Sequence, residues 1–329
     1  MNCKFFSKTE SFYKTLHTSL LGAKKQITLI YFAYDAGIWS EKFNQVLIEK
    51  HSQGCKVRIM VDKFGSITEN IPNTLESRKM LNSLAEKGIE VVLFGSNSGF
   101  GHTLHIKICA IDDGLLLCGG SNIADHYLKW RDVNFSLKGK FGNKFHKIYD
   151  YLLLQTSQGS ELDKKRIIKI EQEISINHPN VYINREEDFN QTRVAVLDLI
   201  KQSKKKLRII TWYFFPDDEI QDALIDCASR GVKIEIINSF NNRVPITNLV
   251  GTISKQKLRK QNIDIFDWKK DYLHTKLYWN DQNDILMGSA NLDYLSLNKS
   301  YEVLIKINDR KIIQQIDHYF DQLISEIND

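Results

Sequence analysis

The sequence has no apolar run that approaches the roughly 18 consecutive residues that a membrane-spanning helix requires. Its first residues, MNCKFFSKTESFYK, contain no apolar core followed by a small-residue cleavage site, which a signal peptide would show. The sequence therefore predicts neither a membrane-spanning helix nor a signal peptide, and we expect a cytoplasmic protein.

Cysteine is scarce and scattered. The five cysteines are Cys3, Cys55, Cys109, Cys118 and Cys227. They form no C-x-x-C pair and have no histidine at metal-ligand spacing. Because their number is odd, we interpret them as reduced, mostly buried thiols. A cluster of carboxylates is absent as well, and we expect no metal and no cofactor.

Size and charge are more informative. A chain of 329 residues suits two domains, each able to bury its own apolar core. The formal net charge of +5 favours partners that carry phosphate. Nucleic acid and an anionic membrane surface both fit, and the charge alone selects neither.

An internal repeat organises the chain. In each half, a β-type run is followed by an amphipathic stretch, a glycine and an apolar strand, and then by a third β-type run. The first half shows these at 27–32, 40–51, 55–62 and 89–94, and the second at 207–214, 218–229, 232–238 and 263–268. We expect an α/β fold of two similar lobes, each a mixed sheet flanked by helices. They would form a pseudo-twofold pseudo-dimer with one active site between them.

The predicted domains follow the repeat. The N-terminal lobe covers residues 1–156, and the C-terminal lobe covers residues 181–329. The segment 157–180 matches neither repeat, so we predict that it links the lobes.

A motif with identical spacing occurs once in each half. It reads H-x-K, four residues, D, six residues, then G-[GS]-x-N. The first copy consists of His105, Lys107, Asp112, Gly119, Gly120 and Asn122. The second consists of His274, Lys276, Asp281, Gly288, Ser289 and Asn291. Six positions that recur at one spacing in otherwise divergent segments are a specific signal.

The spacing predicts a hairpin. The strand period of two places His and Lys on one face, where both can meet one phosphate. A tight turn at 112–114 or 281–283 leads into a returning apolar strand. That strand ends at Gly119 or Gly288, where backbone can approach a ligand closely. Asp112 and Asp281 are predicted to stabilise the turn or form a salt bridge, because Asp bonds its own local backbone in turns.

Two imidazoles suit displacement at a phosphodiester. One histidine would attack and form a phosphohistidine, and the other would protonate the leaving oxygen and later deprotonate the acceptor. Lys107, Lys276, Asn122 and Asn291 would stabilise charge on the non-bridging oxygens. Each histidine also needs a partner on its second nitrogen. Asp132 and Glu302 are the candidates, and the alternative is that both are ordinary strand-edge carboxylates.

These residues resemble the phospholipase D superfamily, whose signature is the duplicated motif. The stretch LHIKICAIDDGLLLCGGSNIADHYLKWRDV looks like the first motif region of bacterial cardiolipin synthases. The stretch LHTKLYWNDQNDILMGSANLDYLSLNKSYEV is similar to the second. Segments 62–66 and 213–217 also look familiar, so the resemblance extends in order over most of the chain.

The resemblance implies phosphatidyl transfer through a phosphohistidine. Phosphatidylglycerol or phosphatidylethanolamine would be the substrate, His105 the nucleophile and His274 the acid. The protein would lie peripherally on the inner face of the cell membrane, with no obligate protein partner. The N-terminal membrane helices of many members are not seen in this sequence. Leu295 stands where many members have Arg, which leaves the acceptor open.

Three alternatives to phosphatidyl transfer remain. A hydrolytic phospholipase D would use water as the acceptor. A nuclease would use the same histidines on nucleic acid, although no aromatic stacking platform interleaved with basic residues is recognised. A binding scaffold without activity would have lost a His or Lys from one motif, and both motifs are intact.

Several other features have two interpretations. The basic runs 204–206 and 255–260 could hold the protein on anionic lipid or form solvated helix faces. The aromatic run 212–215 could border a lipid channel, but core packing is expected for at least half of it. His102 and His126 lie near the first motif and could bind substrate, but surface or packing roles are expected.

Overall fold

The computed structural model describes residues 2–95, 102–139, 141–156, 180–185, 189–244 and 246–329. These residues form two compact units. The first unit holds residues 2–128 and 134–156, and the second holds 129–133 and the described residues from 180 onward. Segment 129–133 thus belongs to the second unit, although its neighbours on both sides belong to the first. The predicted linker 157–180 lies outside the described residues except for Asn180.

A mixed sheet forms the centre of the first unit. Its strands are β1 (Asn2–Phe6), β2 (Gln26–Tyr31), β3 (Lys56–Asp62), β4 (Glu90–Phe94), β5 (Lys107–Ile111), β6 (Leu115–Gly119) and β7 (Asn134–Lys138). Their order across the sheet is β1-β7-β6-β5-β2-β3-β4. β2, β3 and β4 pair in parallel, whereas the pairs from β2 through β5, β6 and β7 to β1 are antiparallel.

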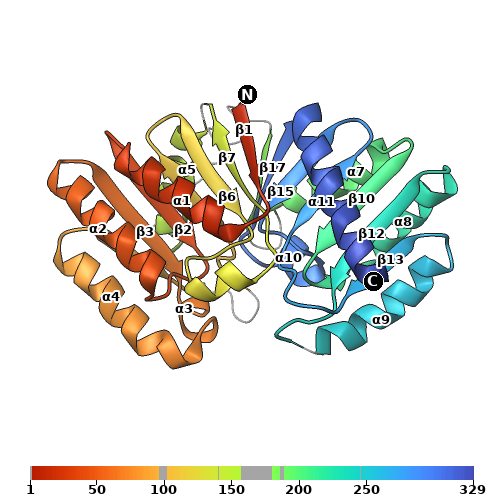
Figure 1. Ribbon diagram of the computed structural model, residues 1–329, viewed down its shortest axis with the longest axis horizontal. Helices are drawn as coiled ribbons and strands as arrows, with labels where there is room; N and C mark the ends of the chain where they lie inside the picture. The colour runs from red at the N-terminus through yellow and green to blue at the C-terminus, as the bar shows by residue number, and fades with distance from the viewer. Residues whose placement is uncertain (1, 96–101, 140, 157–179, 186–188, 245) are drawn as a thin grey trace. The chain divides into compact units, whose positions relative to one another are not determined.

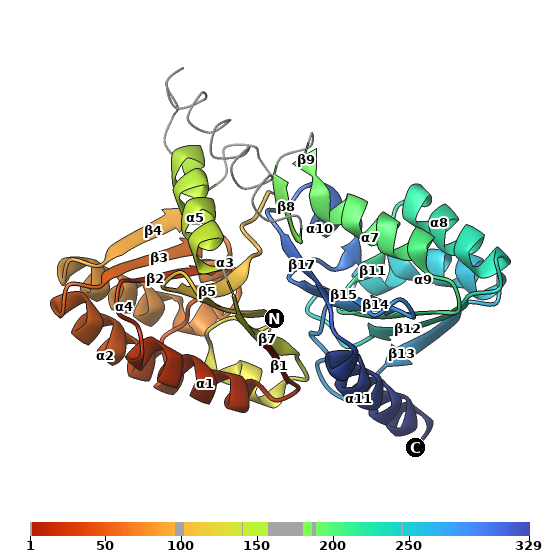
Figure 2. The ribbon, with the colours of Figure 1, turned by 90° about the horizontal axis from the view of Figure 1, so that it is seen from above.

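Helices cover both faces of this sheet. The longer ones are α1 (Thr9–Leu21), α2 (Ile38–Ser52), α4 (Thr74–Glu86) and α5 (Gly142–Thr156). The short ones are α3 (Gly65–Thr68), η1 (Ile71–Asn73) and η2 (Asp125–Lys129). α1, α2 and α4 lie on one face, and α5 lies on the other (Figures 1 and 2). Alternate residues of β2, namely Ile27, Leu29 and Tyr31, face the core that α1, α2 and α4 close, as the period of two requires.

The second unit repeats this arrangement. Its strands are β8 (Val181–Arg185), β9 (Phe189–Asn190), β10 (Lys206–Thr211), β11 (Phe214–Phe215), β12 (Lys233–Ser239), β13 (Asp264–Trp268), β14 (Leu277–Asn280), β15 (Asp284–Gly288), β16 (Leu292–Asp293) and β17 (Val303–Asn308). Its helices are α7 (Gln191–Gln202), α8 (Asp218–Ser229), α9 (Ile246–Arg259), α10 (Tyr294–Asn298) and α11 (Arg310–Asn328). Among the described residues of the unit, the main sheet has the order β13-β12-β10-β14-β15-β17-β8-β9, and β11 pairs with β16.

The two sheets confirm the predicted repeat. Read inward from β1 and from β8, equivalent strands follow in the same order. The predicted amphipathic stretches are α2 and α8, and each precedes a parallel inner strand, β3 or β12. The fold class is therefore confirmed as two similar lobes with mixed sheets. None of the helices within the described ranges is long and apolar enough to cross a bilayer.

An arginine on an inner strand ties one helix of each unit to its sheet, α5 in the first unit and α11 in the second. Arg58 of β3 is 2% exposed and donates to Asp150 of α5. Arg208 of β10 donates to Glu235 at 2.8 Å and to Asp317 of α11 at 2.8 Å. Because a buried guanidinium needs carboxylate partners, these pairs fix where each helix lies on its sheet.

Candidate active site

The first motif forms the predicted hairpin of β5 and β6, with its turn at 112–114. One detail differs from the prediction. His105 precedes β5, and only Lys107 lies on that strand. Lys107 is buried, and its Nζ donates to the His105 carbonyl at 2.7 Å and lies 5.1 Å from the Phe32 ring centre. The ammonium thereby braces the backbone that carries the histidine.

The second motif forms the hairpin of β14 and β15, with its turn at 281–283. His274 and Lys276 both precede β14, and Lys276 Nζ donates to the His274 carbonyl, as in the first copy. The segment 129–133 runs beside this backbone. His274 N donates to the Arg131 carbonyl at 2.8 Å, and Arg131 N donates to the Tyr272 carbonyl at 2.8 Å.

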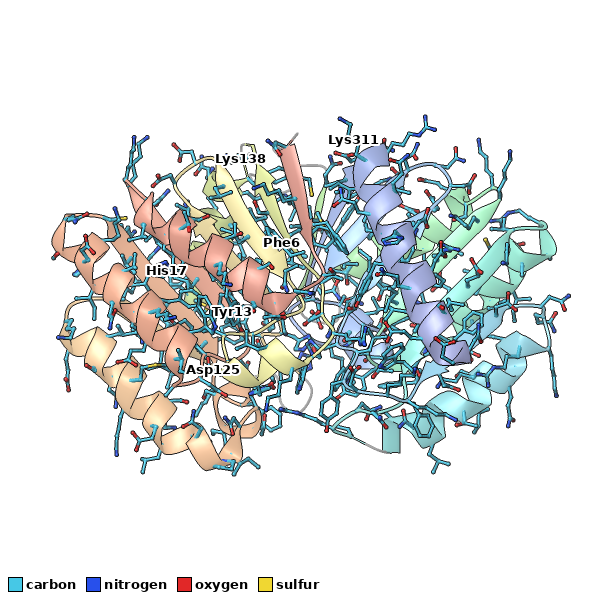
Figure 3. The ribbon with its side chains drawn as sticks, viewed as in Figure 1. Phe6, Tyr13, His17, Asp125, Lys138 and Lys311 are labelled. Atoms are coloured by element: carbon cyan, nitrogen blue, oxygen red, sulfur yellow. The ribbon has the colours of Figure 1, made fainter. Side chains whose placement is uncertain are left out.

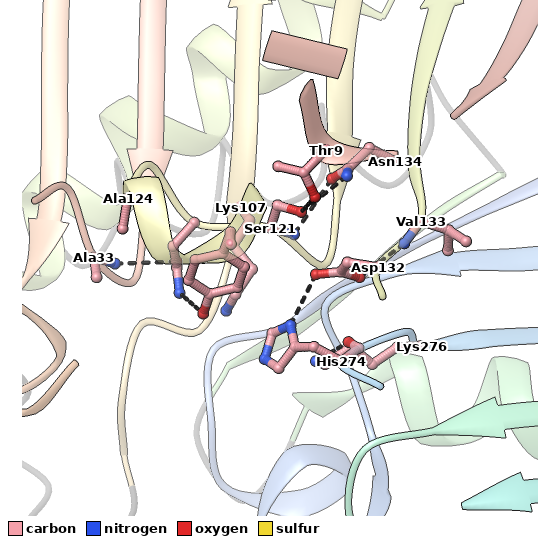
Figure 4. Close-up of polar contacts among 12 residues, drawn as sticks. Thr9, Ala33, Lys107, Ser121, Ala124, Asp132, Val133, Asn134, His274 and Lys276 are labelled. Carbon is pink, nitrogen blue, oxygen red and sulfur yellow. Dashed lines mark hydrogen bonds and ion pairs between the residues drawn. The ribbon is translucent and has the colours of Figure 1, made fainter. Parts of the chain in front are cut away.

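The second unit brings Asp132 and His274 together, although 142 residues separate them in sequence. Asp132 Oδ2 lies 2.9 Å from His274 Nδ1, and the Asp132 side chain is fully buried (Figure 4). Its Oδ1 accepts a hydrogen bond from Val133 N at 2.9 Å. A carboxylate on Nδ1 favours the tautomer with the proton there, which leaves the Nε2 lone pair for chemistry. This contact is the kind of partner expected for a reacting histidine.

Glu302 occupies the matching place one residue before β17 and is also fully buried. Its carbonyl accepts from Asn184 N at 2.9 Å, which fixes the backbone on which the carboxylate stands. The catalytic role of Glu302 stays a prediction.

Aromatic rings enclose His274 within the second unit. The ring centre of Trp212 lies 4.8 Å from that of His274, and that of Trp130 lies 5.5 Å away. Trp212 also stacks on Trp130 at 5.4 Å and packs against Tyr272 at 5.5 Å. In the run 212–215, Trp212 and Phe214 are buried, as expected for at least half of it. The contact between Trp212 and His274 was not predicted from the sequence.

Asn122 is held by contacts within the first unit that the sequence did not reveal. Its Oδ1 accepts from Ala33 N at 3.1 Å, and its Nδ2 donates to the Tyr127 hydroxyl at 2.7 Å. Tyr127 in turn donates to Glu69 Oε1 at 2.7 Å. Tyr127 is only five residues from Asn122, and this proximity in sequence could have suggested it as a partner of the asparagine. Glu69 carries no sequence pattern that marks it.

Neighbouring groups brace the same loop. Tyr13 on α1 is labelled in Figure 3. Its hydroxyl accepts from Ala124 N at 3.2 Å and donates to the Asn122 carbonyl. His126 Nε2 lies 3.2 Å from Glu69 Oε1, and His102 is buried, in keeping with the packing or surface roles expected for both.

Asn291, the counterpart of Asn122, has different surroundings. Its side chain is 2% exposed, and within the described part of the chain no donor reaches its Oδ1. Most buried polar atoms are hydrogen-bonded, so this amide oxygen is an exception that a ligand contact would remove. Because an amide can rotate by 180° to exchange O and N, the same side chain can offer a donor to a phosphate oxygen.

The motif aspartates are structural, but not for the predicted reason. Asp112 Oδ1 accepts from the backbone N of Lys25 at 2.7 Å and of Gln26 at 3.0 Å. Asp281 Oδ1 accepts from Lys204 N at 2.9 Å and from Lys205 N at 3.0 Å. Both therefore clamp the chain that enters β2 or β10 and not their own turn. These backbone donors lower the pKa of Asp112 and lower that of Asp281 to about 2, against the opposing effect of burial.

The glycine at the end of each returning strand lies against the next strand of the sheet. A Cβ on Gly288, whose φ is +157°, would lie 2.0 Å from the Val303 carbonyl oxygen of β17. The close approach that requires glycine is therefore to the neighbouring strand, whereas a ligand had been expected there. Ser289 continues this junction, since Ser289 N donates to the Val303 carbonyl at 3.0 Å and Val303 N donates to Ser289 Oγ at 3.1 Å. In the first unit, Gly119 pairs with Asn134 of β7, and Gly120 follows it.

The structure also bears on the expectations for the cysteines near the first motif and for the basic runs. Cys109 of β5 and Cys118 of β6 are buried, and burial raises the pKa of both thiols, which fits core packing.

Some side chains of the two basic runs form ion pairs within the second unit. Lys206 binds Asp317, and the buried Lys255 binds Asp267 at 2.5 Å, so neither run is wholly a solvated or lipid-facing surface.

Comparison with known proteins identifies the family. Two units with one such motif each have the architecture of the phospholipase D superfamily. Residues 16–150 and 196–324 match the family model described as cardiolipin synthase, PLD-like domain, and the chain belongs to this family.

Curated relatives agree with this assignment. A probable cardiolipin synthase of Bacillus subtilis is 21% identical over 99% of this chain and 66% of its own length. A cardiolipin synthase of Clostridium perfringens is 26% identical over 91% of this chain and 65% of its own. This chain thus spans somewhat less than two thirds of the length of these relatives.

Solved structures share the fold. Phosphatidylserine synthase of Haemophilus influenzae aligns with a TM-score of 0.74 at 16% identity, over 98% of this chain and 86% of that one. Polyphosphate kinase of Porphyromonas gingivalis aligns with a TM-score of 0.62 at 13% identity, over 98% of this chain and 50% of that one.

Proposed function

We propose that the protein transfers a phosphatidyl group between glycerophospholipids, in the manner of a cardiolipin synthase. The observation that carries this proposal is the contact between Asp132 and His274 Nδ1, beside the buried Lys276. It is the arrangement that a histidine needs to exchange a proton or to attack phosphorus through Nε2. Membership of the cardiolipin synthase family directs the proposal to phosphatidyl transfer.

In the proposed first step, the Nε2 lone pair of His105 attacks phosphorus. The bond from phosphorus to the head-group oxygen breaks, and protonated His274 gives its Nε2 proton to that oxygen. In the second step, the acceptor hydroxyl gives its proton to His274, its oxygen attacks phosphorus, and the bond to His105 breaks. The choice of His105 as the nucleophile follows the resemblance to the superfamily.

The remaining site residues support these steps in the proposal. Lys107, Lys276, Asn122 and Asn291 bind the non-bridging oxygens, where negative charge increases in the transition state. Asp132 stabilises the imidazolium form of His274, and Glu302 is the second orienting carboxylate. Asn291 fits its role because its buried amide oxygen has no protein donor among the described residues.

The proposed substrate is phosphatidylglycerol or phosphatidylethanolamine. Both are membrane lipids, so we place the protein peripherally on the inner face of the cell membrane. An anionic surface suits a chain with a formal net charge of +5.

The test uses purified protein, vesicles of the two lipids, and mass spectrometry of the products. His105→Ala and His274→Ala should both abolish cardiolipin formation. His318→Ala is the matched control, because His318 is exposed on α11 and outside both motifs. Phosphatidic acid as the main product would change the assignment to hydrolysis. Cleavage of DNA or RNA without lipid turnover would refute the proposal.

A trapping experiment assigns the nucleophile. With phosphatidylglycerol labelled in its phosphate, rapid quenching should recover labelled protein from wild type and none from His105→Ala. Label retained by His105→Ala and lost from His274→Ala would reverse the two roles.

A further inference from the structure

The second unit exposes a group of apolar side chains next to its aromatic cluster. We define the α9 surface as Phe240, Val244, Leu249, Val250 and Ile253. Leu249 is 67% exposed and Ile253 is 75% exposed, which is unusual for large aliphatic side chains on an ordered helix. They lie about one turn apart on α9.

The opposite side of α9 packs on the unit. Leu258 is buried, and a Cβ on Gly251 would lie 2.3 Å from the Phe214 carbonyl oxygen of β11. The helix is thus seated by one face, while the side chains of the α9 surface stay between 41% and 75% exposed.

The preceding loop is braced, so the apolar side chains are displayed by ordered backbone. Asn248 Nδ2 donates to the Phe240 carbonyl at 2.6 Å, and Asn242 Nδ2 donates to Asn248 Oδ1 at 2.8 Å. Asn242 Oδ1 accepts from Val244 N at 3.0 Å.

Basic side chains border the α9 surface. Residues 240–260 contain no Asp or Glu. Of their basic side chains, Lys255 and Arg259 pair with Asp267, and Lys257 pairs with Asp222. Arg243 lies beside the apolar series, and Lys260 is exposed. Lys269 Nζ also lies 5.4 Å from the Phe240 ring centre. An apolar patch bordered by basic side chains matches the boundary between acyl chains and anionic head groups.

The α9 surface also adjoins the candidate site. The Arg243 guanidinium lies 4.8 Å from the Trp130 ring centre, and Trp130 packs against His274 at 5.5 Å. Val244, the next residue, belongs to the α9 surface. A bilayer against this surface would present lipid phosphates near the ring that flanks the histidine.

The first unit has a similar feature at the equivalent position of the repeat. Phe64, Ile71 and Leu75 are 53%, 70% and 64% exposed. Phe64 and Ile71 lie between β3 and α4, and Leu75 lies on α4. The α9 surface is likewise divided between the loop after β12 and the helix α9. Exposed apolar side chains thus recur after the same strand in both repeats.

We infer that the α9 surface docks on an anionic lipid bilayer and brings the candidate site to its substrate. This inference rests on the proposed function for the choice of a lipid partner. It assigns the contact to specific side chains, which insert at the level of the head groups while α9 lies in the membrane plane.

The test is flotation of the full chain with phosphatidylcholine vesicles that contain or lack phosphatidylglycerol. Wild type should bind the anionic vesicles, and added salt should weaken binding. The double variant Leu249→Ser/Ile253→Ser should partition at least tenfold more weakly. Val194→Ser is the matched control, because Val194 is 54% exposed on α7 and should bind as wild type does. Circular dichroism verifies that each variant is folded.

Turnover of a short-chain, water-soluble phosphatidylglycerol separates this inference from the proposed function. The double variant should keep this turnover and lose turnover of vesicle lipid. Vesicle binding without turnover of any lipid would support the docking surface and refute the proposed function. Failure of wild type to bind anionic vesicles, or undiminished binding by the double variant, would refute docking. So would a wild-type dimer that the double variant dissociates, because a second copy would then cover the surface.

Discussion

Replacing Asp132 by Asn should slow transfer strongly while leaving the fold intact. Asp132 is fully buried, and its Oδ2 lies 2.9 Å from His274 Nδ1. For charge centres about 4 Å apart at an effective dielectric constant of about 20, the carboxylate stabilises the imidazolium by about 4 kcal/mol. This energy corresponds to roughly a thousandfold in rate if the proton is on His274 before transfer.

The amide also favours the wrong tautomer. Val133 N donates to Asp132 Oδ1, and Asn would keep this bond with its own Oδ1. Its NH2 group would then face His274 Nδ1, which would have to act as an acceptor and leave the proton on Nε2. That form is a weak acid, and it cannot take the proton of the acceptor hydroxyl. We therefore expect the transfer rate to fall by about 100-fold to 1,000-fold.

The assay compares two substrates. With phosphatidylglycerol, the alcohol that leaves needs a proton, and the full loss should appear. With a p-nitrophenyl phosphodiester, the leaving group needs little protonation, so the loss in its release should shrink to about tenfold or less. Equal losses on both substrates would refute the role of His274 as the acid.

Asp271→Asn is the matched control. Asp271 accepts from Trp268 Nε1 at 2.8 Å and from Arg131 Nε at 3.1 Å, and no contact links it to the imidazole. It should change the rate less than about fivefold. An Asp132→Asn protein that is folded, by its melting temperature, and retains activity within threefold of wild type would show that the pair has no catalytic role.

Three further predictions concern the supports of the site. Asp281→Ala should lower the free energy of unfolding at pH 7 by about 1–2 kcal/mol, after a discount for solvent exposure. Because the pKa of Asp281 is lowered from 3.8 to about 2, this difference should persist above about pH 4 and vanish as the pH falls through 2, measured by urea unfolding. Gly288→Ala should destabilise the protein by about 3 kcal/mol or prevent soluble expression, because its Cβ would lie 2.0 Å from the Val303 carbonyl oxygen. Gly22→Ala, whose nearest contact is 3.4 Å, should leave the melting temperature within a few degrees of wild type. Tyr127→Phe breaks the link between Asn122 and Glu69 and should lower kcat roughly tenfold with little change in melting temperature, and an unchanged kcat would remove Tyr127 from the support of Asn122.

The repeated motif made much of the fold predictable. Its gaps of four and six residues require a strand, a turn and a returning strand, and both hairpins form as expected. The strand and helix patterns before it were equally clear, since apolar runs predicted β3 and β12, and amphipathic stretches predicted α2 and α8. The pairing of β1 with β7 and of β8 with β17 was not predicted. Pairing between strands far apart in sequence depends on the path of the chain, which local patterns do not encode.

The contacts that explain some motif residues could be identified only from the structure. The sequence marked Asp112 and Asp281 as structural, but turn chemistry suggested bonds to their own backbone. They bind chain segments about 75–88 residues earlier instead. Gly288 likewise faces a neighbouring strand and not a ligand. In both cases the partner is distant in sequence, so spacing could identify the residue but not its contact.

The sequence by itself determined the duplicated motif of this protein: a histidine and a lysine at the start of each of two matching hairpins, with an asparagine after each. This followed because each motif is local, and local spacing fixes local geometry. Only the tertiary structure decided that Asp132, which the sequence places among residues of the first unit, contacts His274 within the second. It also decided that Trp130 and Trp212 flank that histidine, and that apolar side chains of α9 remain exposed beside them. These contacts arise from the packing of segments 129–133, 212 and 272–274, and packing across such separations is set by the whole chain.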